Sequence, residues 1–379
     1  MAGYNPNFID GIHLPLPEFS AGLAGKILNK STLRDGIYAD YINYTLVMNE
    51  DLRTPAFVAL NIDQKGYKKT SRSRWSLDSR IGFENQLDND YYRRNVWDRG
   101  HMARRATSAW GKTVREAQKA SDDTMYYTNC CLQHENLNQD EWLALEDWVK
   151  ELNIDADDKI VSYSGPVYGE LNRSIQPDGR NVAIIPAGFF KVVCFKNKTT
   201  QELDVRAFLM YQDHEALRDK KGKKRFNNQT YQVTITEIEE LTGLNFADEI
   251  YEKNSLFYND SDASRDVNAT TPERIEVSSP DEVISHNTPR SAVFDDEVDV
   301  FISAAMVNPS GNERDGEWVS IINLSSDVVD LSGWKLQDFK RTDLVLESSS
   351  LKLNPGESLC IQSISPLMLT NTGGTLQLV

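Results

Sequence analysis

The feature that most constrains the fold is a break in pattern between residues 251 and 298. This stretch holds eleven acidic and four basic side chains, with scattered Pro, Ser, Asn and Asp and no hydrophobic periodicity. A segment of that composition buries too little apolar surface to keep one fixed structure. We therefore expect residues 251–298 to be an acidic, flexible linker that divides the 379-residue chain into domains at 1–250 and 299–379.

The region before the linker alternates apolar runs with polar or basic connections. Runs rich in β-branched and aromatic residues predict strands, and these lie at 42–48, 56–62, 159–168, 182–195 and 205–212. Apolar side chains at helical spacing predict a helix over 140–152. A capping box of Thr236 and Glu239, followed by Gly243 in the position that ends many helices, predicts a second helix. The first domain is therefore expected to belong to the α+β class.

The region after the linker contains only short strand-like runs. They lie at 298–307, 317–324, 344–353, 357–364 and 374–379, and turn signals such as "NPSG", "NPGE" and "NTGG" separate them. Short strands at this spacing are typical of an all-β sandwich of about 80 residues.

Overall composition limits the classes of function. The formal net charge of −16 argues against a chain that coats nucleic acid through its total charge, although a basic cleft remains compatible with it. The N-terminus has no basic segment followed by an apolar run, and no run of roughly 18 apolar residues occurs, so we expect no secretory signal, no membrane partner and a cytoplasmic protein. The four cysteines lack CxxC spacing and are expected to be reduced.

One short stretch, Asn95–Arg105, is basic within this acidic chain. It places Arg99, Arg104 and Arg105 around His101. Neighbouring cations disfavour the imidazolium form, and a neutral imidazole can act as general base for water. Guanidinium groups also suit phosphate oxygens. The stretch therefore indicates a phosphodiester site, while a structural histidine in a solvated loop is the alternative.

A second candidate element lies about 40 residues further along the chain. Asn138 and Glu146 are eight residues apart, about two turns of a continuous helix, so both can face one cleft. An amide oxygen and a carboxylate acting through water are a suitable partial shell for Mg²⁺. The alternative is that Asn138 is a helix N-cap and Glu146 a solvated helix residue.

Together the two elements resemble the non-specific DNA/RNA endonucleases of the ββα-metal class, the endonuclease G-like family. The family's D-R-G-H stands at 98–101 and its L-N-Q…W…L-E at 137–146, and the flanking pieces from about residue 3 to 246 are similar. The family's N-x-x-P-Q stands at 129–133, with Leu132 in place of the proline. The resemblance implies a ββα-metal nuclease domain, with a central antiparallel sheet and flanking helices.

The resemblance also implies roles for four residues. His101 would be the general base that deprotonates the attacking water. Asn138 would be the direct ligand of one Mg²⁺, with Mn²⁺ as a possible substitute. Glu146 would hold a metal-bound water and help to protonate the leaving oxygen. Arg99 would steady the phosphate.

Further residues are expected around this centre. A second arginine should stabilise the transition state from the "SRSRW" segment, and the sequence leaves open whether it is Arg72 or Arg74. Asp98 is expected to fix the backbone of the motif. The expected substrate-binding residues are Arg104, Arg105, Asn129 and Gln133.

Two basic segments extend the candidate site. Segments 65–74 and 218–225 would form a cationic track for a nucleic-acid backbone, with solvated loops as the alternative. Contacts to phosphate and sugar carry no base information, so we expect low sequence specificity.

The last 80 or so residues resemble the lamin-tail domain, an immunoglobulin-like sandwich. The similarity covers about 299–379 and rests on turn residues such as Asn308, Gly311, Asn354 and Asn371, and on Trp318 and Trp334 as core residues. These positions specify a fold and no chemistry. We expect this domain to bind a protein partner, to bind nucleic acid or to mediate self-association.

The sequence as a whole predicts a Mg²⁺-dependent endonuclease that hydrolyses DNA and RNA. Such an enzyme would threaten its host, which motivates the hypothesis of a regulated defence effector or toxin. The alternative is a catalytically degenerate scaffold that binds nucleic acid or protein through the lamin-tail-like domain. The intact His101, Asn138 and Glu146 argue against this alternative.

Overall fold

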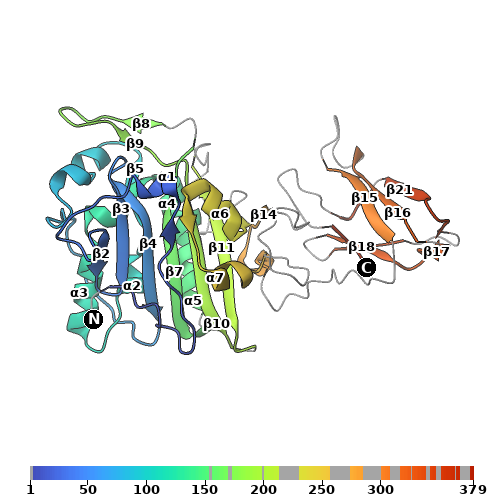
Figure 1. Ribbon diagram of the computed structural model, residues 1–379, viewed down its shortest axis with the longest axis horizontal. Helices are drawn as coiled ribbons and strands as arrows, with labels where there is room; N and C mark the ends of the chain where they lie inside the picture. The colour runs from blue at the N-terminus through green and yellow to red at the C-terminus, as the bar shows by residue number, and fades with distance from the viewer. Residues whose placement is uncertain are drawn as a thin grey trace. The chain divides into compact units, whose positions relative to one another are not determined.

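The structure is a computed structural model. It describes residues 3–152, 156–169, 173–198, 200–212, 230–256, 274–284, 300–307, 316–325, 327–338, 342–346, 351–362, 364–367 and 376–379. The chain forms two compact units (Figure 1). The first contains the described residues up to 256 together with 277–284, and the second contains 274–276 and the described residues from 300 onwards.

The main sheet has eight strands in the order β14-β12-β11-β10-β7-β4-β3-β2, and all of them except β14 belong to the first unit. The strands are β2 (Tyr38–Tyr41), β3 (Tyr44–Asn49), β4 (Thr54–Asp63), β7 (Ala156–Val167), β10 (Gly188–Asn197), β11 (Leu203–Tyr211), β12 (Thr230–Val233) and β14 (Arg274–Glu276). All neighbouring pairs from β2 to β12 are antiparallel. The predicted antiparallel sheet is therefore confirmed.

Smaller elements surround this sheet. The two-stranded ladders are β1 (Glu18–Phe19) with β13 (Leu244–Asn245), β5 (Trp97–His101) with β6 (Cys130–His134), and β8 (Ser174–Ile175) with β9 (Ala183–Ile184). The helices are α1 (Ala21–Ala24), α2 (Arg105–Ser108), α3 (Val114–Asp123), α4 (Glu135–Gln139), α5 (Glu141–Glu151), α6 (Ile235–Thr242) and α7 (Asp248–Glu252). Short 3₁₀ turns lie at Phe83–Asn85, Asn89–Tyr92, Tyr127–Asn129 and Pro280–Glu282.

Both faces of the central strands are covered. In β10, Phe189 packs against Trp142 of α5 with ring centroids 5.7 Å apart. The next residue, Phe190, belongs instead to the core that Ile235 and Ile238 of α6 complete. Successive side chains of a strand point to opposite faces, so α5 and α6 cover opposite sides of the sheet (Figure 1). This two-sided burial explains why the sequence of β10 is almost continuously apolar.

Most predicted elements of the first unit are confirmed, with two corrections. The apolar run 182–195 is not one strand, because Pro186 separates β9 from β10 and cannot donate to a sheet ladder. Helix α6 ends at Gly243, which has the expected left-handed conformation with φ of 73°. Its N-cap, however, is Thr234, whose side chain accepts a hydrogen bond from the Glu237 amide, so the predicted capping box of Thr236 and Glu239 is wrong.

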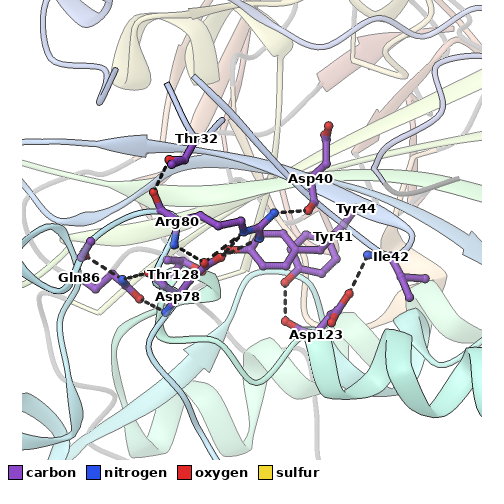
Figure 2. A network of polar contacts seen from close by, with 11 residues as sticks. Thr32, Asp40, Tyr41, Ile42, Tyr44, Asp78, Arg80, Gln86, Asp123 and Thr128 are labelled. Carbon is purple, nitrogen blue, oxygen red and sulfur yellow. Dashed lines mark hydrogen bonds and ion pairs between the residues drawn. The ribbon is translucent and has the colours of Figure 1, made fainter. Parts of the chain in front are cut away.

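A buried polar network fastens the long connection between β4 and β5 to the sheet (Figure 2). The Asp78 carboxylate accepts hydrogen bonds from Arg80, at 2.7 Å, and from the Tyr41 hydroxyl of β2, at 2.6 Å. The Gln86 side chain binds the backbone amide and carbonyl of Asp78 at 2.8 and 2.7 Å. This connection contains Arg72, so the network holds the segment that carries the candidate second arginine.

The predicted linker is partly structured. Residues 274–276 form β14 at the edge of the main sheet, and the Val277 amide donates to the Thr230 carbonyl at 2.8 Å. Ile275 and Val277 are buried, while Arg274 and Glu276 are partly exposed. The interpretation of 251–298 as one flexible segment is therefore wrong over 251–256, which contains the end of α7 and the buried Leu256, and over 274–284. Stretches 257–273 and 285–298 lie outside the described residues.

The second unit is an all-β sandwich. Its strands are β15 (Val300–Met306), β16 (Trp318–Asn323), β17 (Val329–Asp330), β18 (Lys335–Asp338), β19 (Asp343–Val345), β20 (Lys352–Leu353), β21 (Ser358–Gln362) and β22 (Leu376–Leu378). They form the sheets β15-β16-β21, β17-β20 and β19-β18-β22. Alternate residues of β16, such as Val319 and Ile321, enter the core. Trp334 packs against that core as expected, whereas Trp318 is only partly buried and is not part of it.

Several expected features fall outside what the structure describes. The turn residues Asn308, Gly311 and Asn371, His214 and His286, and the basic segment 218–225 are among them. Across the described ranges, no helix combines the length and the apolar character that crossing a membrane requires.

Candidate active site

A cavity of about 460 Å³ lies in the first unit beside β5, α2, α4 and α5. Its lining residues are Arg72, Trp75, Asp98, Arg99, His101, Arg104, Arg105, Ala106, Asn138, Gln139, Leu143 and Glu146. The structure thus brings the candidate base, both candidate metal residues and four of the five candidate arginines to one place.

The ladder of β5 and β6 positions the Asp98–His101 motif. Gly100 pairs with Cys131, and a Cβ atom at Gly100 would lie 2.2 Å from the Gln133 Oε1 atom and 2.5 Å from its Cβ. Only glycine therefore fits between Arg99 and His101 while this ladder forms. This close approach explains the glycine of the motif.

His101 is partly buried against an aromatic ring. The ring of Trp75 lies 4.7 Å from the imidazole, centroid to centroid. Burial is the main cause that lowers the pKa of His101 to about 3, and the positive charges of Arg72, Arg105 and Arg104 add to it. The predicted neutral imidazole is thus supported, but desolvation is its first cause. Of the three arginines that the sequence placed around His101, Arg104 and Arg105 lower its pKa, and Arg99 is not among the causes.

Asn138 and Glu146 reach the cavity from two helices, not one. The chain breaks at Asp140, which has φ −122° and ψ −87°, between α4 and α5. The N-cap of α4 is His134, whose ring nitrogen accepts the Asn136 amide at 3.2 Å. The alternative of Asn138 as an N-cap therefore does not hold, and neither does the assumption of one continuous helix. The expected meeting of the two side chains at one cavity is nonetheless observed.

Asp98 orients the amide of Asn138. The Asp98 Oδ2 atom accepts hydrogen bonds from Asn138 Nδ2 at 2.9 Å and from Gln139 Nε2 at 2.8 Å. An ionised carboxylate only accepts hydrogen bonds, so the nitrogen of the amide must face Asp98. The Asn138 Oδ1 atom is left for a cation in the cavity.

Glu146 lies between two cations. Its Oε2 atom is 3.5 Å from Arg104 Nε, and its Oε1 atom is 3.9 Å from Lys191 Nζ. Burial raises the pKa of Glu146, and the charges of Lys191 and Arg104 oppose that rise. Arg104 in turn donates to Asp147 at 2.6 Å.

The structure distinguishes the two candidate arginines of the "SRSRW" segment. Both arginines are exposed, but Arg72 lines the cavity and lies near enough to His101 to act on its pKa, whereas Arg74 is not among the lining residues. Arg99 also lines the cavity, where its guanidinium lies over the rings of Tyr92 and Tyr127 at 5.3 and 5.9 Å. Arg105 donates to Thr70 at 3.2 Å, which ties α2 to the basic segment 65–74.

The substrate-binding role expected for Asn129 and Gln133 needs correction, because both side chains are fully buried. Asn129 accepts the Ala103 amide at 2.8 Å and donates to the carbonyls of Ala103 and Thr124 at 2.9 and 3.0 Å. Neither residue lines the cavity. Asn129 instead clamps the loop after His101, and Gln133 packs against Gly100.

The lining residues fit a metal ion that keeps most of its waters. Among the residues that the structure describes, no three His, Cys, Asp or Glu side chains gather as a metal-binding group. The cavity offers oxygen atoms of the Asn138 amide and the Glu146 carboxylate, and Asp98 and Gln139 line it beside them. Mg²⁺ binds through one or two protein oxygens and retains waters, so this donor set suits it.

Sequence reasoning missed three residues of this site. Trp75, which packs on His101, directly follows the predicted arginine segment, and Gln139 follows the predicted metal ligand. Lys191 left a clearer signal, since it is a single charge inside the apolar strand "GFFKVVCF". Of the other histidines, His13 is exposed and binds Asn7, at 2.7 Å.

A basic cavity with a neutral histidine, an oriented amide oxygen and a buried carboxylate defines a hydrolase site for phosphate esters. The chain belongs to the DNA/RNA non-specific endonuclease family, whose model matches residues 24–253. A Lamin Tail Domain matches residues 295–375.

The chain is also similar to individual proteins, among them endonuclease G of two mammals. The chain is 29% identical over 269 residues to an uncharacterized protein, y4fB, of Sinorhizobium fredii, which covers 65% of this chain and 39% of that protein. It is 30% identical over 140 residues to mitochondrial endonuclease G of Homo sapiens and of Bos taurus, which covers 35% of this chain and 44% of each relative. The chain thus spans less than half the length of these relatives.

A solved structure of an EndoG/EndoGI complex, concerned with EndoG inhibition, is also similar. It has a TM-score of 0.45 and 22% identity, and it covers 56% of this chain and 86% of that chain.

Proposed function

We propose that the first unit is a metal-dependent endonuclease that hydrolyses phosphodiester bonds of DNA and RNA with little sequence specificity. The observation that carries the proposal is the meeting of His101, Asn138 and Glu146 in one arginine-lined cavity. Family membership supports the nuclease class. Mg²⁺, with Mn²⁺ as substitute, is the cofactor proposed from the oxygen donors.

His101 acts as the general base. Its lowered pKa keeps the imidazole neutral at pH 7, and the neutral ring is the form that can accept a proton from the attacking water. Its Nε2 atom is buried and has no hydrogen-bond partner within the described part of the chain. Trp75 restricts the ring from one side.

Negative charge grows on the phosphoryl oxygens during the attack. Arg72 and Arg99 line the cavity and offset this charge by charge-assisted hydrogen bonds. Asn138 and Glu146 would hold a divalent cation, which supplies further electrostatic stabilisation when bound. Asp98 keeps the Asn138 oxygen turned toward the cavity.

Low sequence specificity follows from the kinds of contact offered. The charged lining can bind phosphate, and the exposed Lys69 and Arg74 continue a basic surface along segment 65–74. Contacts of this kind position a backbone without reading bases. Binding should therefore weaken as salt concentration rises.

The Lamin Tail Domain is proposed to bind a protein partner or a second copy of the chain. We also propose that the protein is a cytoplasmic defence effector or toxin whose nuclease activity is held in check, because free nuclease activity would endanger the host. Harmless expression, with full activity of the purified chain alone, would contradict restraint.

The nuclease proposal is tested with purified protein on supercoiled plasmid and on a structured RNA. We expect both to be cut internally with Mg²⁺, and cutting to stop with EDTA and return on adding excess Mg²⁺. Binding of both nucleic acids without any cleavage at several Mg²⁺ and Mn²⁺ concentrations would contradict the proposal and favour a degenerate scaffold.

A further inference from the structure

Lys191 is a buried cation that the proposed reaction does not use. It lies in β10 with its side chain only 5% exposed, and its Nζ atom donates to Ser164 of β7 at 2.8 Å. The ammonium also lies 4.5 Å from the ring centroid of Trp142. A charged lysine is rarely buried without a function or a strong partner.

The position of Lys191 relative to the active-site cavity is informative. Lys191 points to the same face of β10 as Phe189, toward α5, and its Nζ atom is 3.9 Å from Glu146 Oε1. A second, water-sized cavity of about 10 Å³ is lined by both residues, together with Arg104 and Ser162. Glu146 lines the two cavities, whereas Lys191 lines only the small one. Lys191 therefore approaches Glu146 from the side of the small cavity, away from the active-site cavity.

The other cation beside Glu146 is already shared. Arg104 Nε is 3.5 Å from Glu146 Oε2, while Arg104 NH2 is 2.6 Å from Asp147 Oδ1. Two carboxylates thus face one guanidinium on this side. Without Lys191, the Glu146 carboxylate would depend on Arg104, which also binds Asp147. A buried carboxylate whose counter-charge is shared in this way is unfavourable. The second cation balances the charge. At 3.9 Å it acts on the carboxylate through its charge, because Glu146 Oε1 has no hydrogen-bond partner among the described residues.

We propose that Lys191 is a positioning residue, whose ammonium fixes the Glu146 carboxylate from the side away from substrate so that it can hold the water shell of the metal ion. This proposal rests on the proposed nuclease function. It extends that function to a residue that touches neither substrate nor metal. Partners of this outer kind commonly change metal affinity or activity by about 10- to 100-fold.

The test compares Lys191→Met, which removes the charge and keeps a linear side chain, with Lys191→Arg, which keeps the charge. Arg206→Met is the matched control, because Arg206 is also a buried cation of the main sheet, paired with Asp204 at 3.1 Å. Mn²⁺ binding to the substrate-free protein is measured by electron paramagnetic resonance. The turnover number kcat, KM and the free energy of unfolding are measured on the same samples.

We expect Lys191→Met to weaken Mn²⁺ binding and to lower kcat by about 10- to 100-fold, with KM changed by less than about threefold. Lys191→Arg should keep most of the wild-type Mn²⁺ affinity and kcat. Arg206→Met should lose stability but keep Mn²⁺ affinity. In a Glu146→Gln background, Lys191→Met should cause no further loss of kcat, because the two residues act as one unit.

Folded Lys191→Met protein with wild-type Mn²⁺ affinity and kcat would overturn the proposal. The proposal would also be overturned if the double variant of Lys191→Met and Glu146→Gln lost kcat by the product of the two single losses. If Lys191→Met does not fold, Ser164→Ala decides, since it keeps the charge but removes its anchor and should weaken Mn²⁺ binding by about fivefold; no change would overturn the proposal. A wild type that binds Mn²⁺ but cuts no nucleic acid would refute the nuclease function alone.

Discussion

The Asn138 side chain donates a hydrogen bond to the Asp98 carboxylate at 2.9 Å, and this contact determines which end of the amide faces the cavity. Because the carboxylate only accepts, the Asn138 oxygen is the atom presented to a cation. The aspartate of the motif thus orients a candidate ligand 40 residues further along the chain. The sequence indicated only a role in fixing the motif's own backbone.

Asp98→Ala should therefore impair metal binding. The Asn138 amide loses the acceptor that holds its nitrogen, so Mn²⁺ affinity of the substrate-free protein should fall by about 10- to 100-fold. Titration calorimetry with Mn²⁺ measures the effect. Asp90→Asn, which removes a carboxylate paired with Arg180 on the surface, serves as control. Equal affinities of Asp98→Ala and wild type would show that the contact does not orient the ligand.

The buried neutral His101 should make stability depend on pH. Its folded-state pKa of about 3 lies below the ordinary value of 6.5, so the unfolded chain binds a proton over this interval that the folded protein does not. The free energy of unfolding is therefore at its full value above pH 6.5 and decreases as the pH falls from 6.5 toward 3. Urea unfolding at pH 7 and pH 5 should show a larger loss for wild type than for His101→Gln. Parallel losses would contradict the low pKa.

Arg72 and Arg74 should differ in their effect on catalysis. Arg72 lines the cavity and Arg74 does not. Arg72→Ala should lower kcat by about 100- to 1,000-fold, because one group that offsets transition-state charge is lost. Arg74→Ala should act mainly on KM, and its effect should shrink as salt rises. Steady-state cleavage of a short oligonucleotide separates the two, and the reverse ranking would mean that Arg74 is the reactive arginine.

Asn129→Ala should destabilise the protein without changing its affinity for substrate. The change strands the Ala103 amide and two carbonyls in the interior, at a cost of about 3 kcal/mol in the free energy of unfolding. Urea denaturation gives this value. At a temperature where the variant is folded, KM should match that of wild type. A raised KM with unchanged stability would restore the substrate-binding role that the sequence suggested.

Local spacing predicted some features of the site and missed others. The residues of the DRGH motif were identifiable because β5 carries them consecutively, and Asn138 with Glu146 because they lie close in sequence. The helix from Asp140 onwards was predicted, but the separate short helix α4 that carries Asn138 was not. The choice between Arg72 and Arg74 depended on the path of a connection without strands.

Long-range contacts explain the remaining differences. Asn129 looks like an active-site amide in the sequence, and only its contact with Ala103 shows that it is a buried clamp. Lys191 comes from a strand 45 residues after Glu146, and only the sheet brings the two together. The strand at 274–276 is short and lies in an acidic stretch, so its pairing partner, not its own pattern, defines it.

We propose that His101 activates water for phosphodiester hydrolysis in this cavity. The most direct measurement is the single-turnover cleavage rate of plasmid and RNA with saturating Mg²⁺ for wild type, His101→Ala and His13→Ala, with His13 as an exposed control histidine. We expect His101→Ala to slow cleavage by about 100- to 10,000-fold, while binding of both substrates and the rate of His13→Ala stay near wild type. Equal cleavage rates for wild type and His101→Ala would contradict it.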